Sequence, residues 1–477
     1  MGLAPVGAAA RGAAAAKGMT GQTGNVAQTC PKTILEIGMF FDGTLNNRYN
    51  TISKSRTDDS YKNALSNPAL LYAVYKNGAR YNEPNTCGGV KRAFRSVYVE
   101  GPGSTQGKAD DADGTRYGQG PASGVEARVL AGFRQMVAHI QLLGGAAKLS
   151  KVILDVFGFS RGAAGARYFV NSVRDGKATY DPWGPGDYES VLPAGLKVEI
   201  RFVGVFDTVA AIGLPADDDN DPINVHLKTA QVTNRIYHLT AGDEYRKNFR
   251  LNRNTPGGGD SKSLRGAHSD VGGGYRDKGD RANLESEKQK FFYSSTEAEA
   301  ARAATRRADA APGGNSAAEA VFVREGFLNA NEPTGGAVNI QSPVVHRQVT
   351  VRYGLKTVTR DTYTYTEQLA LDRPWVEVGL SRVALHMMHE ATKAAVNGAI
   401  LDMPTTDQNY VIPAKLKPYE AAIRAGTLTG AAKTAVLRNY GHVSMRGGDM
   451  LSKDQLGLGP ESDHIRVTYA NIVSKAI

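Results

Sequence analysis

The chain has 477 residues, of which 41% are hydrophobic and 22% are charged, a composition that excludes a wholly disordered protein. No apolar stretch approaches the roughly 18 residues that span a bilayer as a helix. The formal net charge of +10 favours anionic partners, but the basic residues are scattered and no nucleic-acid-binding motif occurs, so we predict no nucleic-acid partner.

Residues 1–30 form an Ala/Gly-rich segment that we expect to be a flexible N-terminal tail. Arg11 and Lys17 interrupt the apolar run that a secretory signal peptide requires, so export would need a dedicated apparatus. Cys30 and Cys87 are the only cysteines. They could form one disulfide, but the sequence leaves their pairing open.

The first half of the chain alternates strand and helix patterns. Residues 33–41 form an apolar run that predicts a buried strand, and residues 125–143 carry apolar side chains at helical spacing. Two further buried strands are predicted over 151–157 and 198–206. This alternation predicts an α/β fold with a doubly wound, mostly parallel sheet, which we assign to residues 31–284 as the catalytic core.

The sequence pattern of the second half predicts insertions followed by helices. Residues 285–340 are rich in Ala, Glu and Arg and predict a helical, low-complexity insertion. Residues 341–375 alternate β-branched and polar side chains around Gly354, which predicts a β-hairpin insertion. Helical spacing returns within 376–477, which we expect to complete or cap the catalytic domain.

Residues 158–162 spell Gly-Phe-Ser-Arg-Gly, the G-x-S-x-G pattern of a nucleophile elbow. The pattern alone arises by chance about 0.3 times in a chain of this composition. Here it directly follows the buried strand 151–157 and opens a segment of small residues, which is the strand–turn–helix setting that the chemistry requires. We therefore predict an α/β-hydrolase-like fold with Ser160 as the nucleophile.

A serine nucleophile needs a base and an acid, which α/β-hydrolases present later in the chain. Asp207 ends the predicted strand 198–206 and suits the acid, while His268 lies in a Gly-rich polar loop and suits the base. His442 remains the alternative base. Asp270 and Asp243 remain the alternative acids.

The oxyanion of the reaction needs backbone N–H donors. We expect one from Arg161, the residue after the nucleophile, and a second from Gly43 in the loop after the first strand. Residues 41–45 (FDGTL) also suggest a dehalogenase-type phosphatase, but that chemistry needs an aspartate where this chain has Phe40.

No zinc-protease motif, EF-hand loop or Walker A loop occurs in the sequence. Two acidic stretches, 110–113 and 217–221, could hold Ca²⁺ through clustered oxygens, but we interpret both as solvated loops. We therefore predict no metal site and no cofactor.

Five motifs in order carry a family resemblance. They are 40–46 (FFDGTLN), 158–163 (GFSRGA), 202–209 (FVGVFDTV), 243–246 (DEYR) and 267–275 (AHSDVGGGY). Together they resemble the α/β-hydrolase phospholipase effectors of bacterial type VI secretion, and the helical pattern at 381–399 resembles a later helix of that family. Residues 264–266 (LRG) lack the aromatic side chains that this family often has before its histidine.

The resemblance implies a Ser–Asp–His triad at Ser160, Asp207 and His268, with no cofactor. It implies a phospholipid membrane surface as the substrate, a type VI spike protein or adaptor as the carrier, and a cognate immunity protein in the producing cell. It further implies synthesis in the cytoplasm and action in the periplasm of target bacteria.

Our leading hypothesis is a secreted antibacterial phospholipase of A1 or A2 type that works through an acyl-enzyme. A general carboxylesterase acting on soluble acyl esters is one alternative. A non-catalytic spike adaptor or binding protein is another. The sequence leaves open the acyl position, the lipid head group and the oligomeric state.

Overall fold

The structure is a computed structural model. It describes residues 32–443 apart from 121, 181–187, 214–222, 245, 247, 248, 277, 284–287, 311–321, 330–335 and 355, and it also describes residues 466 and 468–471. The predicted tail 1–30, Cys30 and the acidic stretch 217–221 lie outside the described residues.

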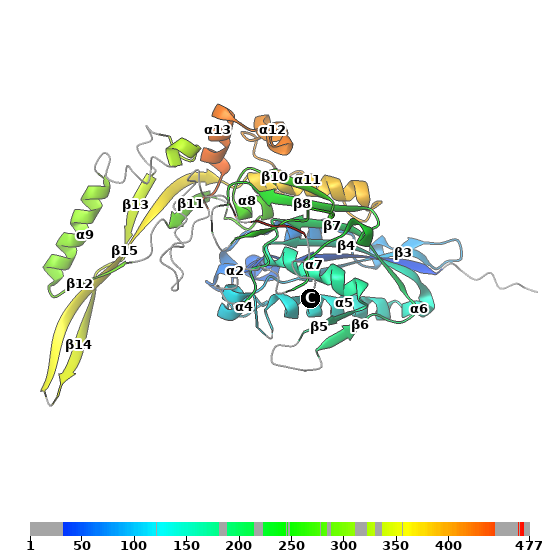
Figure 1. The fold of residues 1–477 in the computed structure, drawn as a ribbon, viewed down its shortest axis with the longest axis horizontal. Helices are drawn as coiled ribbons and strands as arrows, with labels where there is room; N and C mark the ends of the chain where they lie inside the picture. The colour runs from blue at the N-terminus through cyan, green and yellow to red at the C-terminus, as the bar shows by residue number, and fades with distance from the viewer. Residues whose placement is uncertain are drawn as a thin grey trace, which may run out of the picture.

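A seven-stranded sheet forms the centre of the molecule (Figure 1), in the order β10-β8-β7-β4-β1-β3-β2. Every neighbouring pair is parallel except β2 with β3. The strands are β1 (Thr33–Phe41), β2 (Glu83–Pro84), β3 (Val90–Val99), β4 (Leu149–Phe159), β7 (Lys197–Phe206), β8 (Arg235–Ala241) and β10 (Asp260–Leu264). The predicted mixed α/β class with a mostly parallel sheet is confirmed.

Helices cover both faces of this sheet because its strands are apolar on both sides. On β1, Phe40 faces one side and stacks on Phe157 with ring centroids 4.7 Å apart, whereas Phe41 faces the other and packs on Phe169 at 5.3 Å. The first side is covered by α3 (Asn67–Val74) and α11 (Leu380–Ala395). The second is covered by α5 (Val125–Leu142) and α7 (Arg161–Arg174).

Shorter elements complete the core region. They are α1 (Arg48–Ser53), α2 (Asp59–Lys62), η1 (Ala79–Tyr81), α4 (Ala112–Tyr117), α6 (Gly145–Lys148), β5 (Lys177–Thr179), β6 (Glu189–Val191), η2 (Thr229–Gln231), α8 (His268–Gly272), η3 (Lys417–Tyr419), α12 (Glu420–Ala425) and α13 (Gly430–Tyr440). Near the C-terminus, β16 (Thr468–Tyr469) pairs in parallel with β9 (Leu251–Asn252). This pairing returns the end of the chain to the core.

A second, antiparallel sheet forms an arm that projects from the core (Figure 1), and we call residues 278–377 the arm. Its long central strand β15 (Lys356–Glu377) pairs with four strands, β11 (Lys278–Asn283), β12 (Lys288–Phe292), β13 (Gly336–Gln341) and β14 (Val345–Tyr353). Helix α9 (Ser295–Ala310) packs against this sheet.

The structure refines the sequence expectations for this region. The hairpin predicted around Gly354 is present as β14 and β15. The segment 285–340, which we expected to be helical, contains α9 but also β12 and β13. Both strands are short and are held by antiparallel pairing with β15.

Candidate active site

Ser160 stands at the sharp turn between β4 and α7. Its backbone has φ 58° and ψ −130°, a conformation that non-glycine residues rarely adopt. The Ser160 N–H donates to the carbonyl of Phe206 on the neighbouring strand β7, at 3.1 Å. The turn therefore has the strained strand–turn–helix geometry expected of a nucleophile elbow.

The two glycines of the motif allow the close packing of this turn. A Cβ built on Gly162 would lie 2.1 Å from the carbonyl oxygen of Asp42. One built on Gly158 would lie 2.6 Å from the carbonyl oxygen of Gly162. Both distances are far below any real Cβ contact, so these positions accept only glycine without movement of the backbone.

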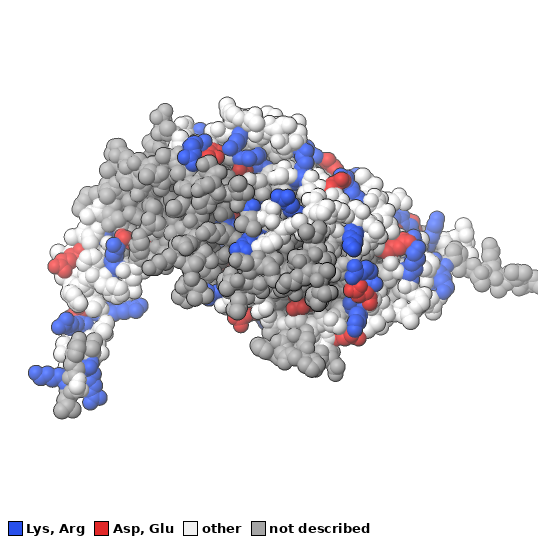
Figure 2. Space-filling view, viewed as in Figure 1, with Lys and Arg blue, Asp and Glu red and all other residues white. Residues whose placement is uncertain are grey.

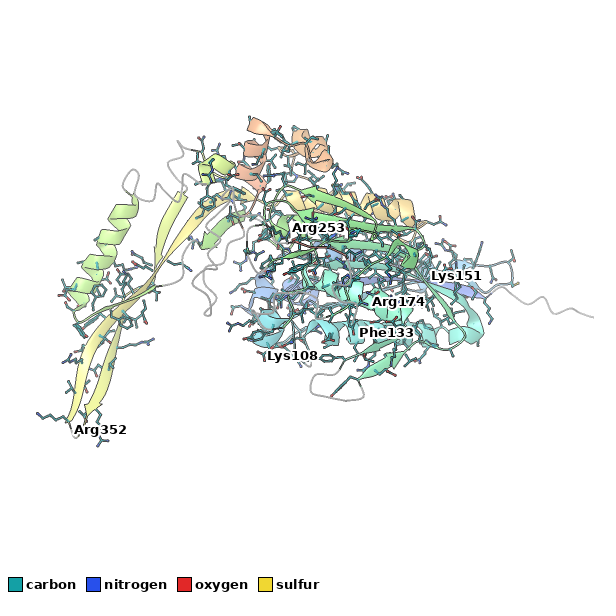
Figure 3. The ribbon with its side chains drawn as sticks, in the orientation of Figure 1. Lys108, Phe133, Lys151, Arg174, Arg253 and Arg352 are labelled. Carbon is teal, nitrogen blue, oxygen red and sulfur yellow. The ribbon has the colours of Figure 1, made fainter. Side chains whose placement is uncertain are left out.

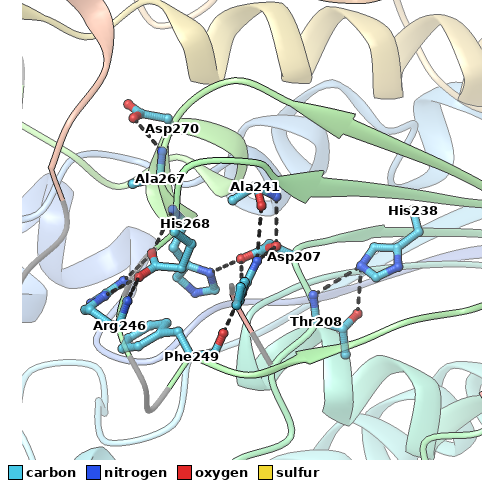
Figure 4. A network of polar contacts seen from close by, with 11 residues as sticks. Asp207, Thr208, His238, Ala241, Arg246, Phe249, Ala267, His268 and Asp270 are labelled. Carbon is cyan, nitrogen blue, oxygen red and sulfur yellow. Dashed lines mark hydrogen bonds and ion pairs between the residues drawn. The ribbon is translucent and has the colours of Figure 1, made fainter. Parts of the chain in front are cut away.

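Asp207 and His268 are brought together (Figure 4), and Asp207 directly follows Phe206, whose carbonyl accepts the Ser160 N–H. Asp207 follows β7, whose Phe206 is level with Phe159 of β4, and its Oδ2 lies 2.5 Å from His268 Nδ1. The His268 ring packs on the Phe159 ring at 4.6 Å between centroids. The structure thus places Ser160 and Asp207 directly after the adjacent parallel strands β4 and β7, and His268 at the first residue of the short helix α8 rather than in the expected loop.

The hydrogen bond to Asp207 determines which nitrogen of His268 is available. With Nδ1–H donated to the carboxylate, Nε2 is the basic atom of the neutral imidazole. His268 is 4% exposed, and among the described residues its Nε2 has no hydrogen-bond partner. In the described part of the chain, His268 and Ser160 Oγ are not hydrogen-bonded to each other. In enzymes without substrate, the hydrogen bond between a serine nucleophile and its base is often long and tightens when substrate binds.

Arg466 is a member of this network that our sequence reasoning missed. Its guanidinium donates to both oxygens of Asp207, at 2.7 and 2.8 Å, and the backbone N–H of Ala241 donates to Oδ1 at 2.9 Å. Burial alone would raise the pKa of Asp207, but Arg466 and His268 together hold that pKa well below its usual value. No local pattern around position 466 indicates this contact, because the partners lie 259 residues apart.

A second ion pair supports residues 266–272, which include α8 and which we call the histidine loop. Glu244 accepts the backbone N–H of His268 at 3.1 Å and forms a two-pronged ion pair with Arg246. Burial tends to raise the pKa of Glu244, but the Arg246 guanidinium brings it below its usual value. The pKa of His268 is lowered, chiefly because burial disfavours the imidazolium, although Asp207 opposes this shift. The burial of His268 therefore favours the neutral form of the proposed base, against the opposing effect of the Asp207 and Glu244 carboxylates.

The two predicted oxyanion donors differ in their surroundings. Arg161 is the first residue of α7, where backbone N–H groups have no partner within the helix. The Gly43 N–H instead donates to Asp42 Oδ1 at 2.8 Å. Burial raises the pKa of that carboxyl to about 6, and the Tyr98 hydroxyl donates to its other oxygen. The Gly43 donor is therefore occupied in this structure.

The alternative base and acids have other partners. His442 Nδ1 lies 2.7 Å from Asp270 Oδ1, and Asp270 Oδ2 also accepts the backbone N–H groups of His442 and Ala267. Asp243 accepts the N–H of Gly266 and forms an ion pair with Arg265. These contacts hold the histidine loop in place from its far side.

His238 lies on the other side of Asp207 (Figure 4), where its Nε2 accepts the backbone N–H of Thr208 at 3.2 Å. Burial lowers the pKa of this histidine to about 3, so it is neutral near pH 7. Within the described part of the chain, no group of three or more His, Cys, Asp or Glu side chains is arranged to hold a metal ion. The described helices also include none long and apolar enough to cross a membrane.

Comparisons with known proteins extend this picture. The family model for the catalytic domain of Tle1-like phospholipase effectors of the type VI secretion system matches residues 192–293, which include Asp207 and His268. A search of curated proteins finds no significant match.

Among solved structures, that of the Tle1 effector bound to the VgrG spike from the type VI secretion system superposes with a TM-score of 0.53. It is 20% identical, and the alignment covers 93% of this chain and 94% of that one. An uncharacterized protein from Pseudomonas aeruginosa gives a TM-score of 0.42 at 19% identity, over 85% of this chain and 52% of that one. The likeness to the Tle1 effector structure is one of fold, and with the family match it confirms the resemblance that the motifs predicted: this chain is similar to the Tle1-like phospholipase effectors of the type VI secretion system.

Proposed function

We propose that this protein is a serine phospholipase of A type, with Ser160 as nucleophile, His268 as base and Asp207 as the acid that orients it. The observation that carries the proposal is the 2.5 Å contact between Asp207 and His268, next to a serine in a strained turn. Perturbed, buried titratable groups beside such a turn are the usual mark of an acyl-transfer site.

The proposed chemistry is acyl transfer. His268 Nε2 removes the Ser160 hydroxyl proton as Oγ attacks the ester carbonyl, and Asp207 stabilises the imidazolium. The tetrahedral intermediate collapses when the imidazolium gives that proton to the leaving alkoxide of the lysophospholipid. Water, activated by the same histidine, then hydrolyses the acyl-enzyme to free fatty acid and regenerates the serine.

The oxyanion would be held by the backbone N–H of Arg161 and, as the second donor, by that of Gly43. The Gly43 N–H must leave the Asp42 carboxyl to reach the oxyanion. Protonation of Asp42, whose pKa is raised to about 6 by burial, weakens that competing bond in mildly acidic conditions. Each well-placed donor contributes roughly 100- to 1,000-fold in rate.

The biological setting is part of the proposal, and the family match supports delivery by a type VI secretion system. The substrate would be a glycerophospholipid in a membrane of the target bacterium, reached from the periplasm. A type VI spike protein or adaptor would carry the enzyme, as supported by the Tle1 effector structure being that of a complex with the VgrG spike. A cognate immunity protein would protect the producing cell.

Vesicles of phospholipids with different acyl chains at the two glycerol positions test the proposal. We expect the wild-type chain to release one fatty acid and the matching lysophospholipid, and the identity of the released chain distinguishes A1 from A2 cleavage. His268→Asn should abolish release, whereas His442→Asn should retain it, because only His268 pairs with Asp207. Comparable turnover of short soluble esters would favour a general carboxylesterase, and no release by folded protein would favour a non-catalytic adaptor.

A further inference from the structure

The β14–β15 hairpin of the arm has two faces of different chemistry. In an antiparallel pair, residues directly opposite each other share a face, and successive residues alternate. The register pairs Val345 with Thr364 and Val349 with Arg360, and Phe291 of β12 pairs with the same Thr364. We call the face that carries these side chains the outer face, and it includes Phe291, Val345, Arg347, Val349, Lys356, Val358 and Arg360.

The apolar side chains of the outer face are in solvent. Phe291 is 67% exposed, Val345 45%, Val349 44% and Val358 36%. Together with Tyr293, they are five of the nine large hydrophobic residues that are exposed in the described part of the chain. Such a concentration on one small element marks an interaction surface rather than the scatter of single apolar residues found on any protein.

The charges on this face have one sign. Arg347, Lys356 and Arg360 lie among the valines, and no Asp or Glu occupies an outer-face position of β14 or of the paired residues 356–364 of β15. Figure 2 shows Lys and Arg gathered at the tip of the hairpin, and Figure 3 labels Arg352 at the same tip, which the register places on the opposite face. The outer face therefore combines exposed β-branched and aromatic groups with uncompensated positive charge.

The opposite face of the hairpin is polar and internally paired. His346 Nε2 lies 2.8 Å from Asp361, and the hydroxyls of Thr350 and Thr359 lie 3.0 Å apart. Closer to the core, Phe292 stacks on the buried Tyr365. Several side chains of this face pair with one another, whereas the valines and the three cationic side chains of the outer face are exposed.

The root of the arm is tied to the loop of the proposed base. Strand β11 begins at Lys278, ten residues after His268. At the root, Asp280 accepts from the buried guanidinium of Arg373 and from the N–H of Val443, whose neighbour His442 binds Asp270 of the histidine loop. A surface bound by the arm would therefore be held at the end of the core that carries Ser160.

We propose that the outer face of the arm binds the surface of an anionic phospholipid bilayer. Cationic side chains attract the negative lipid surface, and the exposed valines and Phe291 enter the interface between head groups and acyl chains. The choice of a bilayer over an acidic protein rests on the proposed phospholipase function, because the arm would then keep the enzyme at its substrate between turnovers.

Sedimentation with vesicles tests this proposal without hydrolysis if every chain carries Ser160→Ala. We expect the full-length chain to sediment with vesicles that contain anionic lipid and to remain largely in solution with neutral ones. The pair Arg347→Gln and Arg360→Gln should weaken binding roughly fivefold per cation removed, about 25-fold in total. The pair Val349→Ser and Val358→Ser should also weaken binding to anionic vesicles, because it removes apolar side chains that enter the interface.

Two control pairs of substitutions distinguish a specific contribution of the outer face to binding from effects of net charge and of folding. Lys91→Gln with Arg134→Gln removes the same charge from exposed positions of the core, and Thr350→Ser with Thr359→Ser alters the polar face of the hairpin. Neither should change binding. The arm variants are also made in the chain that retains Ser160. These variants should hydrolyse a soluble short-chain ester at the wild-type rate, and this rate tests folding and catalysis independently of vesicle binding.

Two outcomes would overturn the proposal. One is an equal loss of binding for Arg347→Gln with Arg360→Gln and for Lys91→Gln with Arg134→Gln. That result would show that binding depends on net charge alone and not on the outer face. The other is a full-length chain that stays in solution with anionic vesicles, which would leave an acidic protein as the partner of this face. A chain that binds vesicles but hydrolyses no lipid would instead contradict the proposed function and keep the arm proposal.

Discussion

Asp207 is held by a full positive charge as well as by the histidine it orients. Arg466 donates two hydrogen bonds to its carboxylate, in a site where Asp207 itself is completely buried. The ion pair keeps the carboxylate ionised despite burial, but it also offsets part of the negative charge that would stabilise imidazolium at His268. We interpret Arg466 as a positioning residue that holds Asp207 and helps to keep His268 unprotonated.

Replacement of Arg466 by Gln should change the pH profile as well as the rate. His268 acts as a base only when neutral, and removal of a nearby positive charge raises its pKa. The acidic limb of kcat/KM should therefore move to higher pH by about one unit. Loss of the charge-assisted hydrogen bonds should lower kcat/KM roughly 10- to 100-fold. The profile of hydrolysis against pH measures both effects.

Arg466→Lys should restore part of the rate and most of the profile, because the charge returns without the two-pronged geometry. Arg253→Gln removes the same charge from an exposed position nearby and should change neither quantity. A lower rate with an unmoved acidic limb would show that Arg466 serves the fold alone.

At the scale of elements, the elbow was predictable and the arm was only partly so. The strand 151–157, the motif at 158–162 and the small residues after it describe a strand, a turn and a helix from local sequence alone, and β4 and α7 confirm them. Strands β12 and β13 are only five and six residues long and depend on pairing with β15, which lies later in the chain, so local sequence did not predict them. The pairing of β16 with β9 brings the C-terminal part of the chain back to the core, and Arg466 contacts Asp207 there. No local sequence pattern indicates this long-range pairing.

Gly162→Ala tests the close approach at the elbow. The new Cβ would lie 2.1 Å from the backbone carbonyl of Asp42, so either α7 or the 42–44 loop must move. We expect the free energy of unfolding to fall by about 1–3 kcal/mol and hydrolysis to fall with it. Urea unfolding and ester hydrolysis measure the two effects.

Gly165→Ala is the matched control in the same helix. Its nearest contacts would be side-chain carbons of Val125 and Val129 at 3.4 Å, which is ordinary van der Waals contact. Since Ala favours a helix over Gly by about 1 kcal/mol, this variant should be as stable as the wild type or more so. Equal loss for both variants would contradict the assignment of Gly162 to a close approach.

At the scale of the whole molecule, the net charge of +10 and the positive outer face of the arm act in the same direction. Attraction between a cationic protein and an anionic surface is screened by salt, with a Debye length near 10 Å at 0.1 M. We expect binding to anionic vesicles to weaken as NaCl rises from low to high concentration, whereas hydrolysis of a soluble ester should change little. Vesicle binding that is indifferent to salt would contradict an electrostatic contribution.

The central claim is that Ser160 attacks phospholipid esters, and hydrolysis of mixed-chain phospholipid vesicles by wild type and Ser160→Ala tests it most directly. Mass spectrometry of the lipids follows free fatty acid and lysophospholipid together. We expect both products from the wild type and at least roughly 1,000-fold less from Ser160→Ala, with unchanged stability. Equal release by the two proteins, or none by a folded wild type, would contradict the claim.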